Sequence, residues 1–206
     1  VDLAEGKKSL PDPPIASIGY QASIVITPQQ EADMDIKATL NNLLIPYTSN
    51  YAGTLLPGIR EYTVTPGEKT TTISGKGKAG LKQEENYYFF YLPVCYKGIT
   101  RKSYAYYNTS RSKNLYLPAS VDENYSYDIQ LPENLTLCTP IQEKKIDNPI
   151  GSFKITLTSE GSSLHIELAL QIKKQLITPA EYPAFRSLIT EWTDRTRKPI
   201  LFKTVQ

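Results

Sequence analysis

The chain has 206 residues, enough to bury the core of one large β domain or of two small ones. Its 23 Lys and Arg residues nearly balance 21 Asp and Glu residues, and a net charge of +2 argues against an electrostatic nucleic-acid binder. No apolar run approaches the length of a membrane span. The sequence lacks a charged-then-apolar leader, so we expect a processed product or an excised domain.

The N-terminal part predicts an arm followed by paired strands. Prolines at 11, 13 and 14 favour an extended linker or interdomain arm over residues 1–14. Alternating apolar residues predict strands at 18–26 and 32–40, separated by a turn at 28–31. Residues 41–62 are ambiguous between a strand end, an irregular segment and a short helix broken by Pro57, and 70–74 predict a weak strand.

The middle of the chain is rich in aromatic residues. Residues 87–92 are apolar or aromatic at every position, which predicts that the segment 84–96 contains a central strand or a strand shielded on both faces. Residues 97–113 are polar with scattered tyrosines and favour a loop or an edge region. Alternation predicts a further strand at 125–131, and 135–137 predict a short one.

The clearest hairpin comes next. Apolar residues alternate with polar ones over 153–158 and 164–172, on either side of a turn at 160–162. Such alternation is typical of a sheet with one wet and one dry face. His165 falls on the wet face, opposite Leu164 and Ile166.

One helix is predicted, at 178–192. Thr178 suits the N-cap, Pro179 the first helical position, and Glu181 completes a capping box. An apolar stripe recurs at three- and four-residue steps, and we expect it to pack on the preceding strands; it comprises Tyr182, Phe185, Ile189 and Trp192. Residues 199–204 predict a last edge strand, with Pro199 at its first position.

These elements predict an all-β fold, mainly an antiparallel β-sandwich, with one C-terminal α-helix packed on it. An open barrel is the alternative. Residues 15–206 are expected to form this domain, as one unit or as two subdomains that divide near 75–85.

Two features of the sequence suggest nucleotide binding or thiol catalysis, and both are weak signals. Residues 75–80 match GxGxxG, but no helix and no acidic residue follow at the required spacing, so we interpret them as a flexible surface turn. Cys95 and Cys138 are interpreted as two buried free thiols rather than a disulfide. A dyad of Cys95 with His165 is disfavoured, because a buried neutral thiol is a poor nucleophile. We therefore assign no catalytic residue, no metal ligand and no cofactor.

The tyrosine-rich stretch allows two interpretations. Core and rim packing is favoured over a stacking platform for a glycan or a peptide. If a binding surface exists here, its candidates are Tyr104, Tyr106 and Tyr107.

The second half resembles a known family. Its marks are Arg111 ahead of Leu115 and Pro118, the YDIQLP segment at 127–132, and Pro179, Tyr182 and Phe185 of the predicted helix. In these marks, residues 100–206 resemble the C-terminal β domain of exported bacterial transglutaminase-like proteins, which are related to papain-like cysteine proteases. The function of that C-terminal domain is unknown. Residues 15–62 resemble, more weakly, the strands that follow the core in those proteins. The family's Cys, His and Asp triad belongs to the core, and no segment here matches it.

The resemblance implies a non-catalytic accessory domain, periplasmic or extracellular. Its expected partners are the transglutaminase-like core and the N-terminal domain of the same polypeptide. The alternative is a stand-alone module that binds a glycan or a peptide through its tyrosine-rich surface.

Overall fold

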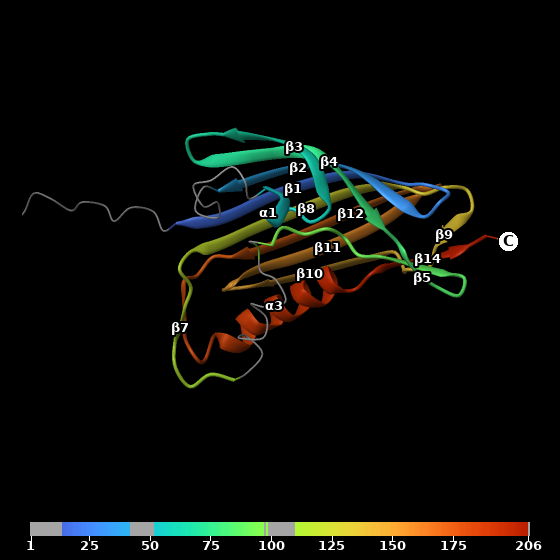
Figure 1. The fold of residues 1–206 in the computed structure, drawn as a ribbon. Coiled ribbons are helices and arrows are strands. Elements are labelled where there is room, and N and C mark those ends of the chain that lie inside the picture. Colours follow the sequence, from blue (N-terminus) through green and yellow to red (C-terminus); the bar gives the residue numbers. More distant parts are fainter. Residues whose placement is uncertain (1–13, 42–51, 97, 99–109, 206) are drawn as a thin grey trace, which may run out of the picture.

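The structure is a computed structural model that describes residues 14–41, 52–96, 98 and 110–205. Its main feature is a large sheet built from β1 Ile15–Ile26, β2 Glu31–Asn41, β3 Ile59–Pro66, β4 Thr70–Gly80, β8 Ser120–Gln130, β10 Gln142–Asn148, β11 Gly151–Glu160 and β12 Ser163–Ile172. These eight strands lie in the order β10-β11-β12-β8-β1-β2-β4-β3 (Figure 1).

The remaining elements are smaller. A four-stranded sheet, in the order β5-β6-β14-β9, contains β5 Lys82–Glu84, β6 Tyr87–Phe90, β9 Leu135–Leu137 and β14 Ile200–Thr204. A short ribbon pairs β7 Leu115–Tyr116 with β13 Leu176–Ile177, and the helices are α1 Ala52–Leu55 and α3 Tyr182–Arg197. Figure 1 shows α3 and the four-stranded sheet on the same side of the large sheet.

Side-chain alternation explains the two faces of the large sheet. Along β1 every second residue from Ile18 to Ile26 is buried, and along β12 every second residue from Leu164 to Ile172 is buried. The residues between them face outward and are half-buried or exposed. The predicted hairpin is therefore confirmed as β11 and β12, whose turn places Gly161 at a φ of 57°. The prediction of an all-β fold with one C-terminal helix packed on it is also confirmed.

The pairing at the centre of the large sheet is parallel. β1 pairs antiparallel with β2 on one side but parallel with β8 on the other, with Tyr20 opposite Tyr125. A parallel pair needs a long connection, and here the segment from 27 to 119 supplies it. The local sequence patterns carry no signal for this pairing.

The helix begins later than predicted. It starts at Tyr182, not Thr178, and Pro183 rather than Pro179 lies in its first turn. The predicted capping contact still forms in part, because the Glu181 carboxylate accepts hydrogen bonds from the Thr178 backbone N–H at 3.1 Å and from its hydroxyl at 3.0 Å. Residues 179–181 form a turn that this carboxylate closes, and the helix follows the turn.

Three strands differ from what the sequence predicts. The predicted last edge strand, now β14, starts at Ile200 and lies between β6 and β9, so it is an interior strand. Within the predicted segment 84–96, β6 covers only Tyr87–Phe90. It lies between β5 and β14, as expected of a central strand, but Tyr87 is 37% exposed, so one of its two faces is not shielded. β10 was not predicted; it carries Lys and Glu on an edge of the large sheet.

The structure describes the chain on both sides of the predicted subdomain break, but little of the predicted N-terminal arm. The arm at 1–14 lies outside the described residues except for Pro14, whose carbonyl accepts a hydrogen bond from the Ser120 N–H at 3.0 Å. The chain leaves the large sheet at Gly80 and enters the four-stranded sheet at Lys82, within the predicted break at 75–85. The division into subdomains stays a prediction. In the described part of the chain, no helix combines the length and the apolar character needed to cross a membrane.

Candidate functional site

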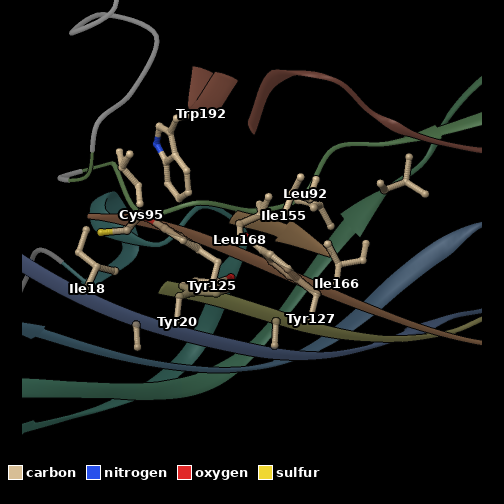
Figure 2. Packing of buried hydrophobic residues seen from close by; sticks show 14 of the residues in the cluster. Ile18, Tyr20, Leu92, Cys95, Tyr125, Tyr127, Ile155, Ile166, Leu168 and Trp192 are labelled. Carbon is tan, nitrogen blue, oxygen red and sulfur yellow. The ribbon is translucent and has the colours of Figure 1, made fainter. Parts of the chain in front are cut away.

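The apolar stripe of α3 lies against the dry face of the large sheet. Its four predicted residues, Tyr182, Phe185, Ile189 and Trp192, are each at most 3% exposed. The Trp192 ring lies beside Tyr125 of β8 (Figure 2), with 5.6 Å between the centroids. The centroid of Phe153 on β11 is 6.5 Å from that of Trp192. Burial of each such side chain contributes roughly 1.5–3 kcal/mol, so this stripe holds the helix on the sheet.

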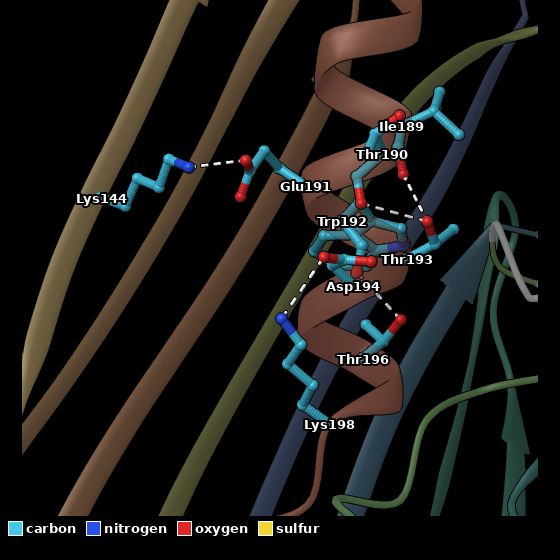
Figure 3. A network of polar contacts seen from close by, with 9 residues as sticks. All are labelled: Lys144, Ile189, Thr190, Glu191, Trp192, Thr193, Asp194, Thr196 and Lys198. Carbon is cyan, nitrogen blue, oxygen red and sulfur yellow. Dashed lines mark hydrogen bonds and ion pairs between the residues drawn. The ribbon is translucent and has the colours of Figure 1, made fainter. Parts of the chain in front are cut away.

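Ion pairs and hydrogen bonds also stabilise α3. Glu191 pairs with Lys144 of β10 at 2.5 Å, and Asp194 pairs with Lys198 at 3.4 Å (Figure 3). The buried Thr193 hydroxyl donates to the Ile189 carbonyl at 2.8 Å, which satisfies it inside the helix. The Lys144 contact ties α3 to the edge strand of the large sheet.

A row of buried tyrosines holds the segment that follows β6. Tyr20, Tyr125 and Tyr127 stand side by side on β1 and β8, and the Tyr127 hydroxyl donates to the Pro93 carbonyl at 2.7 Å. The Tyr125 hydroxyl donates to the Glu123 carboxylate at 3.2 Å. Burial raises the pKa of all three phenols, so they remain protonated. Tyr125 and Tyr127 use their protons in these hydrogen bonds, whereas the buried Tyr20 hydroxyl has no hydrogen-bond partner among the described residues.

The structure does not bring Cys95 and His165 together. Cys95 is 1% exposed and lies beside the buried tyrosines, on the side of the sheet that Trp192 covers (Figure 2). His165 is on the opposite, wet face as predicted, where its Nδ1 lies 2.7 Å from Asp128 Oδ1 and its Nε2 lies 3.4 Å from Glu167 Oε1. The hydrogen bond to Asp128 raises the pKa of His165.

The second cysteine differs from its prediction. Both thiols are free, as expected, but Cys138 is exposed. It follows the short strand β9, where its backbone N–H donates to the Leu201 carbonyl at 2.8 Å. In the described part of the chain, His, Cys, Asp and Glu side chains form no cluster of three that could hold a metal ion.

The GxGxxG match is part of a strand, and its interpretation as a surface turn is wrong. Residues 75–80 complete β4 and pair with β2, and residues 75–77 also pair with β3. A Cβ on Gly75 would lie 2.1 Å from the Glu61 carbonyl oxygen, and one on Gly77 would lie 2.6 Å from that of Gly58. The glycines thus permit close approach of β3 at the point where its register shifts, between Ile59 and Glu61.

The tyrosines proposed as a binding surface cannot be placed. Tyr104, Tyr106 and Tyr107 lie outside the described residues. Of the other tyrosines in that stretch, Tyr88 is buried and Tyr96 is exposed. Tyr91 is half exposed beneath the Lys82 ammonium, whose Nζ is 5.3 Å from the ring centroid.

A groove with a volume of about 520 Å³ runs along the N-terminal half of α3. Arg111 enters it from the segment before β7, Tyr182 and Arg186 come from α3, and Ile146 comes from β10. The Arg111 guanidinium carbon lies 5.7 Å from the centroid of the Tyr182 ring, a cation–π contact. In the sequence, Arg111 is a mark of the family resemblance, and Tyr182 is both such a mark and part of the apolar stripe. No local signal shows that the two residues meet.

Comparison with known proteins gives a family match, similar solved structures and one negative result. Residues 86–202 match the family described as "Domain of Unknown Function with solved-structure structure" (DUF3858). The crystal structure of a "putative protease" from Parabacteroides distasonis ATCC 8503 is similar, with 31% sequence identity and a TM-score of 0.51 over 59% of this chain and 24% of that one. No curated protein matched.

The family match includes β6, the tyrosine row of β8, the β11–β12 hairpin and all of α3. It contains both Arg111 and Tyr182 of the groove, and most of the second layer on the dry face. Since it spans more than half of the 206 residues, the chain belongs to the DUF3858 family.

Proposed function

We propose that this chain is a non-catalytic accessory domain of a larger exported protein with a transglutaminase-like, papain-related core. The observation that carries the proposal is the similarity to the Parabacteroides distasonis protein, at 31% identity. The matched part accounts for only 24% of that chain, so there the related fold is one portion of a much longer polypeptide.

The placement of the reactive side chains supports a non-catalytic role. Nucleophilic catalysis by a thiol needs a base within hydrogen-bond reach of the sulfur. Cys95 is buried beside protonated phenols, whereas His165 is held by two carboxylates on the other face of the sheet. A thiol that is buried in this way is a poor nucleophile.

The arrangement also suits a rigid structural unit. The helix and the segment at 91–96 cover the dry face, with Trp192 and Tyr127 as their anchors. The wet face is left to polar side chains of the central strands. In the proposal this unit packs against the core and the N-terminal domain of the same polypeptide, in the periplasm or outside the cell.

The experiment compares the 206-residue chain with the polypeptide that its gene encodes, intact or with this segment deleted. Casein hydrolysis and amine incorporation into casein report protease and transglutaminase activity. The chain alone should show neither above buffer, and the deletion should lower the thermal stability of the remaining protein. Turnover by the purified chain alone would contradict the proposal.

A further inference from the structure

The groove beside α3 has the features of a ligand site. We propose that it binds a carboxylate group of a peptide, held by the guanidinium of Arg111. This inference concerns residues of this chain only and does not depend on the accessory role.

Arg111 is fixed before any ligand arrives. Its guanidinium lies over the ring of Tyr182, which is 3% exposed. That ring is in turn packed against Phe185, with 5.9 Å between the centroids. A stacked, planar guanidinium keeps its N–H groups in one plane and loses little freedom when it binds.

The Nε donor of Arg111 is shielded from the groove. This atom is buried and has no hydrogen-bond partner among the described residues. A ligand in the groove would therefore have to bind through the two terminal nitrogens of the guanidinium. Their edge of the planar fork can bind a carboxylate through two parallel hydrogen bonds.

The charge of the groove favours an anion. Arg186 adds a second guanidinium to the lining. Glu191 is the acidic residue of the lining, and its carboxylate is paired with Lys144 on β10 at 2.5 Å. The lining thus carries two guanidinium groups against one carboxylate, and its net positive charge favours an anion.

The walls favour a peptide over a hydrated inorganic anion. Ile146, Pro179 and Pro183 line the groove as apolar surface beside the two arginines. A volume of about 520 Å³ lies in the range of sites that take small organic ligands. The carboxylate can come from an Asp or Glu side chain or from a free C-terminus, and the same planar fork fits both.

The test is a titration of the 206-residue chain, followed through the arginine Nε–H signals in ¹⁵N–¹H NMR spectra. The signal of Arg111 is assigned by its loss in Arg111→Gln. The probes are acetyl-Ala-Glu-Ala-amide, with a side-chain carboxylate, and acetyl-Ala-Ala-Pro, with a terminal one. Acetyl-Ala-Gln-Ala-amide and acetyl-Ala-Ala-Pro-amide are their neutral counterparts.

We expect a saturable shift of the Arg111 Nε–H signal with at least one of the two peptides that carry a carboxylate and with neither neutral counterpart. The peptide that binds shows whether the carboxylate comes from a side chain or from a C-terminus. Backbone amide shifts of α3 should show that Arg111→Gln weakens binding about tenfold or more. Arg111→Lys should weaken it too, because an ammonium cannot make the paired contact. Arg60→Gln, an exposed arginine on β3, is the matched control and should leave the affinity unchanged.

Three results would overturn the proposal. They are the absence of a saturable shift with both acids, equal binding of the neutral amides, and unchanged affinity in folded Arg111→Gln and Arg111→Lys. The thermal melts of the variants establish that they fold. Since Arg111→Lys keeps the positive charge, a loss of affinity there separates paired recognition from general attraction.

Discussion

The ring of Trp192 on α3 and the ring of Tyr125 on β8 lie with their centroids 5.6 Å apart, tilted by 51°. This contact joins the only long helix in the described part of the chain to a central strand of the large sheet. It lies next to the Tyr20 and Tyr127 rings, so the aromatic side chains of three elements form one cluster.

Trp192→Ala should therefore lower the free energy of unfolding by about 3–5 kcal/mol, the range for loss of a large buried aromatic side chain. Urea denaturation followed by circular dichroism measures it. Tyr116→Ala is the control, because Tyr116 is 69% exposed, and it should change stability by less than about 0.5 kcal/mol. Similar effects of the two variants would show that α3 is not held by this stripe.

The glycines of the GxGxxG match offer a second test. Gly75→Ala should destabilise the protein by about 2 kcal/mol, because its Cβ would lie 2.1 Å from the Glu61 carbonyl oxygen. Gly80→Ala, in the same strand, has nothing within 4 Å of the new Cβ and should stay within about 0.5 kcal/mol of the parent. If both substitutions were neutral in denaturation experiments, β3 would not approach β4 as described.

The turn before α3 predicts a dependence on pH. Hydrogen bonds from Lys174, and then from the Thr178 backbone and hydroxyl, lower the pKa of Glu181 from 4.5 to about 2. Because the folded-state pKa is the lower one, the contribution of Glu181 to stability is present above pH 4.5 and is lost as pH falls toward 2. The difference in unfolding free energy between the parent and Glu181→Gln should be largest above pH 4.5 and vanish near pH 2. In a Lys174→Met background this pH-dependent difference should shrink; an unchanged difference would argue against the Lys174 contact.

His165 is the single histidine, so its ring signals are unambiguous in NMR spectra. Its pKa should lie above 6.5, chiefly because of the hydrogen bond to Asp128. A raised pKa stabilises the fold at pH values below 6.5, and this contribution is lost as pH rises through the folded-state pKa. Asp128→Asn should lower the pKa by more than Glu167→Gln does, and a reversed order would place the main partner of the ring elsewhere.

The two thiols should differ in reactivity. Iodoacetamide should modify Cys138 in the folded protein and reach Cys95 only after unfolding, since Cys138 is exposed and Cys95 is buried. Peptide mass spectrometry of samples taken over time distinguishes the sites, and protein unfolded in urea provides the control in which both react. Rapid labelling of Cys95 at neutral pH in folded protein would revive the thiol as a nucleophile.

Several strands could be predicted from the sequence because their burial repeats every second residue. The stretch from Ile18 to Ile26 and the hairpin up to Ile172 show this alternation without interruption, and both are strands. β10 escaped prediction because Ile146 is its one apolar residue in a run of charges and amides, as suits an edge strand. Residues 75–80 were misinterpreted because glycines in a strand look like a turn until the neighbouring backbone is known.

The groove could not be predicted from local patterns. Arg111 and Tyr182 are far apart in the sequence, and their contact depends on how the segment before β7 crosses the start of α3. The parallel pairing of β1 with β8 has the same origin, because long-range partners leave no mark on local periodicity. The separation of Cys95 from His165, in contrast, follows largely from the strand parity that put His165 on the wet face.

The most direct test of the non-catalytic role is kcat/KM of the polypeptide that the gene encodes, measured with Cys95→Ala and His165→Ala combined. If the chemistry resides in a separate core, the double variant should retain the casein-hydrolysing or amine-transferring activity of the parent within about twofold. A loss of about a hundredfold or more in a variant that still melts like the parent would place the reactive thiol in this domain and contradict the account.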